Sequence, residues 1–91
     1  MYDIIYYQSA RGEELVKEFL HGLDQKSQVK AYARLALLAE EGPNLKRPYA
    51  DVVQDKIREL RVRFSKTNVR LFYFFFRQRG QARGVKSSLD T

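Results

Sequence analysis

Apolar and polar residues alternate along residues 57–64, and a second, strongly apolar segment follows at residues 69–76. Because successive side chains of a strand face opposite sides of a sheet, the first segment predicts a strand with one apolar and one charged face. The two faces are Leu60, Val62 and Phe64 on one side, and Glu59, Arg61 and Arg63 on the other. The second segment is apolar on both faces, which predicts a strand with other structure on both sides.

A short polar segment at residues 65–68 separates these two strands and predicts that they form a hairpin. One arginine, Arg70, stands inside the apolar second strand. A guanidinium in such a place costs free energy unless it is paired with an acid or given an anion. If Phe64 pairs with Val69, then Arg63 and Arg70 become neighbours across the two strands.

The first half of the chain predicts a strand followed by two helices. Apart from Asp3, residues 2–7 are β-branched or aromatic, which predicts a short buried strand. Ser9 is the expected cap of the first helix and Gly22 its end, whereas Asp24 is the expected cap of a second helix that ends at Gly42–Pro43. The helical spacing predicts these buried positions: Leu15, Val16, Phe19, Leu20 and Leu23, then Val29, Tyr32, Leu35, Ala36, Leu38 and Ala39.

Three basic residues, Lys26, Lys30 and Arg34, recur at intervals of four along the second predicted helix. A solvated helix face explains such a stripe more simply than a binding role, and this is the interpretation that we favour. Residues 44–54 show no clear period and are expected to form a connecting loop, with at most a helical turn at residues 49–53.

Composition excludes several classes of site. The chain has no cysteine and one histidine, so a thiolate nucleophile, a cysteine-ligated zinc site and a multi-histidine metal site are impossible. No metal or cofactor is therefore expected. The longest apolar run, residues 71–76, is far shorter than a membrane span, which predicts a soluble, cytoplasmic protein. The net charge of +6, with its basic excess after residue 44, favours a polyanionic partner such as nucleic acid, or an acidic protein.

Candidate chemistry rests on basic and aromatic side chains. Arg61, Arg63 and Arg70 could hold phosphates in bidentate hydrogen bonds and stabilise the charge of a phosphoryl-transfer transition state. The alternative is that they form surface ion pairs of little energetic worth, and spacing alone does not decide between the two. Three acids are available for such pairs: Glu59, Asp55 and Asp51.

The aromatic residues of the second strand have two interpretations as well. They could stack on nucleic-acid bases, as in single-strand binders, but packing in the core is the favoured role. The residues concerned are Phe72, Phe74, Phe75 and Phe76.

The order of predicted elements, together with the segments Gly42–Pro48 and Glu59–Phe64, resembles the RelE/ParE superfamily of bacterial toxins. Within it, the phage-derived Gp49-like or HigB-like branch is most similar, over about residues 1–76, which we expect to form the domain core. The resemblance implies an α+β fold in which two N-terminal helices pack on a small twisted antiparallel sheet. It also implies a cognate antitoxin, expected to be a helix-turn-helix protein.

The same resemblance implies the toxin of a type II toxin-antitoxin system, acting as a metal-independent endoribonuclease. Such toxins inhibit translation by cutting mRNA on the ribosome, directing a 2′-hydroxyl at the adjacent phosphate. By position, Arg61 and Arg63 match the basic pair of the central strand, and Arg70 matches the arginine that contacts the scissile phosphate. Lys66 and Lys86 are the expected substrate-binding lysines. The alternatives are a non-enzymatic binding module: a ParE-like gyrase inhibitor or a basic RNA-binding phage protein.

The C-terminal segment, residues 77–91, departs from the family pattern. Relatives continue with an apolar strand and a Gly-Phe-x-Lys-Lys-Thr-like segment, which only Lys86 matches loosely here. The segment is expected to be either a strand over residues 81–86 or a basic tail, and the change suggests a truncated or frame-altered end. Without the apolar strand, activity would be weakened. Residues 74–76 would then lie at an uncovered sheet edge, through which copies of the chain could pair.

Overall fold

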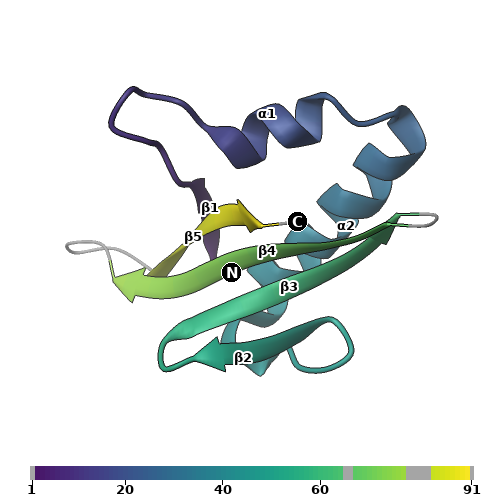
Figure 1. Ribbon diagram of the computed structural model, residues 1–91. Helices are drawn as coiled ribbons and strands as arrows, with labels where there is room; N and C mark the ends of the chain where they lie inside the picture. Colours follow the sequence, from purple (N-terminus) through teal and green to yellow (C-terminus); the bar gives the residue numbers. More distant parts are fainter. Residues whose placement is uncertain (1, 65–66, 78–82, 91) are drawn as a thin grey trace.

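Five strands form a single sheet in the part of the chain that the computed structural model describes: residues 2–64, 67–77 and 83–90, with residues 77 and 83–90 described by their backbone alone. The elements are β1 (Asp3–Tyr6), α1 (Leu15–His21), α2 (Gln25–Glu41), η1 (Gly42–Asn44), β2 (Ala50–Gln54), β3 (Ile57–Phe64), β4 (Thr67–Arg77) and β5 (Arg83–Asp90). The strand order is β1-β5-β4-β3-β2, and the helices lie on one side of the sheet (Figure 1). Only the β1–β5 pairing is parallel. The predicted α+β class is confirmed.

The helix boundaries follow the predicted caps with one exception. Asp24 caps α2, accepting a hydrogen bond from the Ser27 backbone N–H at 3.1 Å. Hydrogen bonding by the Ser27 side chain, and next by its backbone, lowers the pKa of Asp24. Gly22 ends α1 as expected. The Ser9 prediction is wrong, because the residue before α1 is Glu14 and its side chain makes no capping bond. The Ser9 hydroxyl instead accepts from the Glu13 backbone N–H, which closes the loop before the helix.

The buried face of α2 is narrower than the predicted stripe. Ala31, Leu35 and Leu38 are buried, whereas Val29 is 65% exposed and Tyr32 is also exposed. The exposed row of α2 comprises residues 29, 32 and 36, each of which follows directly after a residue of the row 28, 31 and 35. Because successive residues of a helix differ by about 100° around its axis, only one of these two rows faces the sheet. On α1, Val16 and Leu20 are buried as predicted, but Leu15 is exposed.

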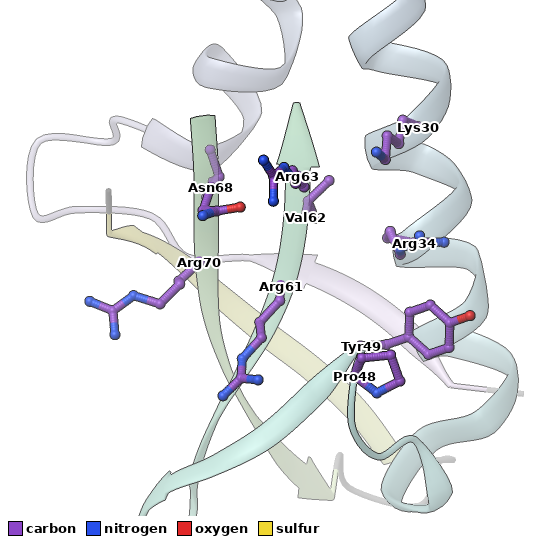
Figure 2. Close-up of a pocket in the computed structure, with 10 residues that line it drawn as sticks. Lys30, Arg34, Pro48, Tyr49, Arg61, Val62, Arg63, Asn68 and Arg70 are labelled. Carbon is purple, nitrogen blue, oxygen red and sulfur yellow. The ribbon is translucent and has the colours of Figure 1, made fainter. Parts of the chain in front are cut away.

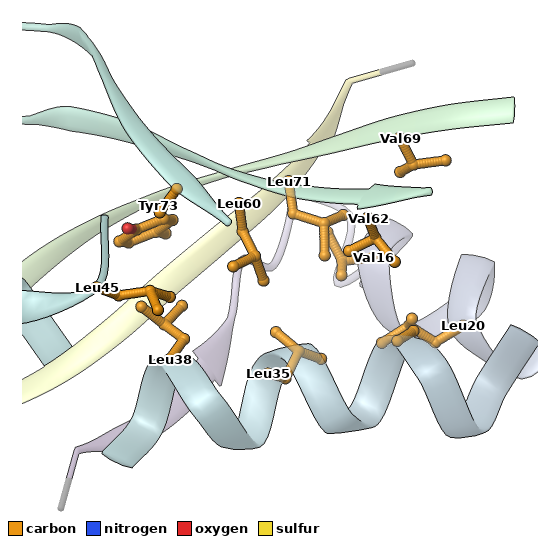
Figure 3. Packing of buried hydrophobic residues seen from close by; sticks show 12 residues of the cluster. Val16, Leu20, Leu35, Leu38, Leu45, Leu60, Val62, Val69, Leu71 and Tyr73 are labelled. Atoms are coloured by element: carbon orange, nitrogen blue, oxygen red, sulfur yellow. The ribbon is translucent and has the colours of Figure 1, made fainter. Parts of the chain in front are cut away.

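The core lies between the two helices and the sheet face that carries Leu60, Val62, Leu71 and Tyr73 (Figure 3). Its buried members are Val16, Leu20, Ala31, Leu35, Leu38, Leu45, Ala50, Leu60, Val62, Val69, Leu71 and Tyr73. Alternation along β3 therefore gives the predicted apolar face. None of the helices in the described part of the chain is long and apolar enough to cross a membrane.

Residues 50–54 form a strand rather than the expected loop with a helical turn. This strand, β2, runs antiparallel to β3, with Ala50 opposite Leu60 and Asp51 opposite Glu59. Ala50 is buried, but the successive residues Val52 and Val53 are both exposed. A strand at the edge of the sheet with two adjacent exposed apolar residues has no period-two pattern, which is why the sequence did not predict it.

The β3–β4 hairpin has a register two residues away from the predicted one. Phe64 pairs with Thr67 rather than Val69, so Arg61 faces Arg70 and Arg63 faces Asn68. A shift of two residues leaves every side chain on its expected face, because the strand period is two. Arg63 and Arg70 are therefore not direct neighbours, although they share a face.

The C-terminal strand is present in the sheet. β5 lies between β4 and β1, with Phe75 opposite Val85 and Leu71 opposite Leu89. The expectation of a strand confined to residues 81–86, or of a tail, is wrong within the described residues, and residues 78–82 and 91 lie outside them. The expected uncovered edge at residues 74–76 is also wrong, since this part of β4 pairs with β5. Pairing on both edges stabilises a strand whose own sequence has few apolar residues.

Gly42 lies where the end of α2 packs closely on the N-terminal segment. Its φ is +55°, and a Cβ added at this position would overlap the ring of Tyr2. Tyr2 is itself held close to α2, because its backbone N–H donates to the Ala39 carbonyl at 2.8 Å. Gly42→Ala is expected to lower the free energy of unfolding by about 2 kcal/mol, through strain and the clash together. Urea denaturation measures this effect.

The matched control is Gly22→Ala, at a glycine with φ of −81° where the nearest atoms to a Cβ are 3.6 Å away. We expect it to change the free energy of unfolding by less than about 0.5 kcal/mol. Equal losses in the two variants would contradict the proposed close packing at Gly42.

Candidate functional site

A cavity of about 440 Å³ lies where β2 stops covering the edge of β3. Pairing between β2 and β3 reaches Ala50 opposite Leu60, and one further bond joins the Arg61 N–H to the Tyr49 carbonyl at 2.8 Å. Beyond Arg61 no strand among the described residues pairs with this edge of β3. Figure 2 shows the residues of α2 on one side and those of β3 and β4 on the other. The lining residues are Lys30, Arg34, Pro48, Tyr49, Arg61, Val62, Arg63, Asn68, Val69 and Arg70.

The sheet brings the three predicted arginines into this one site. Arg61 and Arg63 alternate along β3, and Arg70 of β4 stands directly opposite Arg61. Like charges in direct cross-strand register destabilise a sheet unless a counter-charge lies between them. The Arg61–Arg70 pair therefore requires an acid nearby.

Glu59 supplies that acid. Its side chain is 8% exposed, and its two carboxylate oxygens contact Arg61 Nε at 2.6 Å and Arg70 Nη1 at 3.5 Å. Asp51, opposite Glu59 on β2, accepts from Arg47 Nε at 2.8 Å and contacts Arg61 Nη2 at 3.3 Å. A row of two acids thus lies beside a row of two arginines, and the ion pairs run between the rows.

The ion pairs orient Arg61 without using all of its hydrogen-bond donors. A guanidinium has five N–H groups, of which Nε and one on Nη2 point at carboxylates here. The hydrogen bond to Glu59 raises the pKa of Arg61 above its ordinary value, so the group stays charged. The side chain remains 45% exposed, and that of Arg70 is 50% exposed. Arg61 therefore keeps N–H donors that can bind a further anion.

The ion-pair alternative drawn from the sequence holds for Arg61 and Arg70, which pair with Glu59 and, for Arg61, also with Asp51. Within the described residues Arg63 has no ion pair, and Asp55 takes no part in one. Because these pairs leave donors of Arg61 available, ion pairing and anion binding are compatible at this residue.

The two predicted lysines cannot both be placed. Lys66 lies outside the described residues. Lys86 lies on β5, where its backbone pairs with Phe74. The β5 residue that pairs with Arg70 is Asp90, four residues further along the strand. At about 3.4 Å per residue, this is about 14 Å along the strand from the Arg70 position.

The aromatic residues of β4 divide between the two faces of the sheet. Of the four phenylalanines, Phe75 packs partly buried against the core, as the favoured interpretation expects. For Phe72 and Phe74 core packing is wrong, because they alternate to the other face, where Phe74 lies 6.0 Å from Phe76 between ring centroids and the Arg70 guanidinium lies 5.6 Å from the Phe72 ring.

Two basic residues of the site were not among its predicted members. Lys30 and Arg34 of α2 line the cavity opposite the sheet arginines, and the Arg34 guanidinium lies 4.6 Å from the centre of the Tyr49 ring. The sequence did carry a signal: residues 25–39 contain no acid, so neither basic residue has a partner one turn away. The stripe was interpreted as a solvated face, and the structure places two of its members in the cavity wall.

Glu59 is expected to stabilise the fold by separating Arg61 from Arg70. Glu59→Gln keeps the shape but removes the counter-charge, and should lower the free energy of unfolding by about 1–2 kcal/mol in urea denaturation. Glu13→Gln is the control, since the Glu13 carboxylate is exposed and lies 4.0 Å from Arg11. It should have an effect below about 0.5 kcal/mol. Similar effects in the two variants would show that Glu59 does not have this role.

Asp51 is expected to make stability depend on pH. The Val52 backbone N–H, followed by Arg47, lowers the pKa of Asp51 below its ordinary 3.8. A lowered folded-state pKa means that the contribution is present above pH 3.8 and is lost as pH falls through the folded-state value. The melting temperature of Asp51→Asn should therefore lie below that of the parent chain at pH 7, with the gap closing below pH 3.8. A gap that stays constant with pH would contradict this.

Comparison with known proteins identifies the family. The model of the family described as "Phage derived protein Gp49-like" matches residues 18–82, which include both helices from Glu18 onward and the whole arginine-bearing hairpin. No curated protein and no solved structure matches the chain significantly. The match covers well over half of the sequence, and the chain belongs to the phage-derived Gp49-like family, which is related to the RelE/HigB-like toxins.

Proposed function

We propose that this chain is the toxin of a type II toxin-antitoxin system that cleaves mRNA on the ribosome without a metal ion. Family membership supports the toxin class. The single observation that carries the activity is the gathering of Arg61, Arg63 and Arg70 at one cavity, where Glu59 contacts both Arg61 and Arg70. Such an arrangement suits a phosphodiester.

The proposed reaction uses the substrate's own 2′-hydroxyl. Its oxygen forms a bond to the adjacent phosphorus and loses its proton, while the bond from phosphorus to the 5′-oxygen breaks and that oxygen gains a proton. The products are a 2′,3′-cyclic phosphate and a 5′-hydroxyl. Negative charge builds up on the non-bridging oxygens in the transition state, where Arg61 and Arg70 can stabilise it.

The charge balance of the site favours binding of an anion. Among the described residues that line the cavity, five carry a cationic side chain and none is acidic. In the same part of the chain, the carboxylates of Glu59 and Asp51 contact the arginines and offset part of this charge. Preorganised cations of this kind need little rearrangement when the transition state forms.

We also propose that a helix-turn-helix antitoxin from the same operon neutralises the toxin. Carboxylates presented by such a partner could occupy the arginine site and exclude the phosphate of the RNA. The neighbouring reading frame is the simplest observation that tests this partner. The departure of residues 80–91 from the family's Lys-Lys-Thr-like segment leads us to expect slow turnover.

Arg70→Ala is the sharpest test of the proposed activity. Expression of the parent chain should arrest translation and cut mRNA at the ribosomal A site, as mapped by primer extension. Loss of Arg70 should reduce cleavage at least about 100-fold, the usual effect of removing one transition-state donor. The fold should persist, because Glu59 keeps its 2.6 Å contact with Arg61.

Arg11→Ala is the matched control, since its side chain is 89% exposed and lies outside the cavity lining. It should cut like the parent chain. Undiminished cleavage by Arg70→Ala would remove Arg70 from the site. Inhibition of DNA supercoiling without mRNA cleavage would favour the gyrase-inhibitor alternative, and RNA binding alone would favour the RNA-binding one.

A further inference from the structure

The wall of the cavity opposite the sheet arginines has its own binding chemistry. Lys30 and Arg34 stand one helical turn apart on α2, and both line the cavity. Among the described residues Lys30 has no ion pair. A helix face that only shields the core normally carries charges of both signs, whereas this stretch of α2 has cations alone.

Tyr49 gives this wall a flat aromatic surface, and its backbone is hydrogen-bonded to the backbone of Arg61. The Cζ atom of Arg34 lies over the Tyr49 ring, 4.6 Å from its centre, and Tyr49 as a whole residue is still 38% exposed. The Tyr49 carbonyl accepts from the Arg61 N–H at 2.8 Å, while its own N–H donates to the Lys46 carbonyl at 3.1 Å. The ring and the phosphate-binding arginine are therefore joined through one backbone hydrogen bond.

The cavity is large enough to hold a small organic group in addition to a phosphate. At about 440 Å³ it lies in the range of pockets that enclose small organic ligands, roughly 300–1,000 Å³. Aromatic rings and guanidinium planes are the surfaces on which proteins stack unpaired bases. Asn68, on the opposite wall, carries an amide that can both donate to and accept from a base edge.

We propose that Lys30, Arg34 and Tyr49 form a nucleotide subsite for single-stranded RNA. The base of the nucleotide beside the scissile phosphate stacks on the Arg34–Tyr49 pair, and Lys30 binds the next phosphate of the strand. This subsite rests on the proposed function for the identity of its ligand. It adds to that function a surface that selects unpaired nucleotides and sets the position of the strand relative to Arg61.

Binding of RNA that cannot be cleaved tests the subsite separately from the activity. The probe is a fluorescein-labelled RNA hexanucleotide with 2′-O-methyl groups throughout, compared by anisotropy with an abasic strand of the same length. Tyr49→Leu should weaken binding of the base-bearing strand about tenfold and leave the abasic strand unaffected. Tyr49→Phe should bind like the parent chain, and Tyr49→Trp should bind more tightly, which keeps the test valid if the leucine variant does not fold.

Lys30→Gln should weaken both strands and lower the slope of log affinity against log salt by about 0.7, the value for one single-strand phosphate contact. Lys26→Gln is the matched control, one turn earlier on α2 and outside this cavity lining, and should leave the slope unchanged. Equal effects of Tyr49→Leu on both strands, or no effect on either, would overturn the subsite. Base-dependent binding without ribosomal cleavage would keep the subsite and reject the proposed activity.

Discussion

The carboxylate of Glu59 is the constraint on which the charged face of the sheet depends. The strand registers put Asp51 opposite Glu59 and Arg61 opposite Arg70, so each row alone would be repulsive. The contacts of Glu59 with Arg61 and Arg70, and of Asp51 with Arg61, join the two rows into one network. The sheet can therefore hold two arginines side by side, with the carboxylate of Glu59 in contact with both.

The packing of α2 on the other face of the sheet supplies the second wall of the cavity. Leu35 and Leu38 of α2 pack with Leu60 in the core (Figure 3), and Lys30 and Arg34 of the same helix line the cavity. Because β2 stops pairing at Ala50, the edge of β3 is open where Arg61 and Arg63 stand. Core packing thus sets the distance between two basic walls, and the same apolar contacts that stabilise the domain also shape its site.

The sequence predicted most of the elements and the three arginines, because alternation along residues 57–64 and the cap at Asp24 are local signals. It could not predict β2 or the extent of β5, whose strand state comes from pairing with neighbours distant in the chain. The hairpin register failed for the same reason, since residues 64 and 69 are as suitable a pair as 64 and 67 by apolar pattern alone. Lys30 and Arg34 were missed as site residues because the absence of acids along residues 25–39 indicates a basic helix face, whereas only tertiary packing shows that this face meets a cavity.

The position of β5 affects the order in which the domain can fold. Within the described residues β1 pairs only with β5, although 76 residues separate the end of β1 from the start of β5 at Arg83. Contacts of such long sequence separation form late and slowly. During synthesis the β3–β4 hairpin and its arginines emerge before the strand that joins β1 to the sheet. A nascent chain therefore carries the basic residues of the site before its sheet is complete, and the finished fold arises only when its last strand inserts.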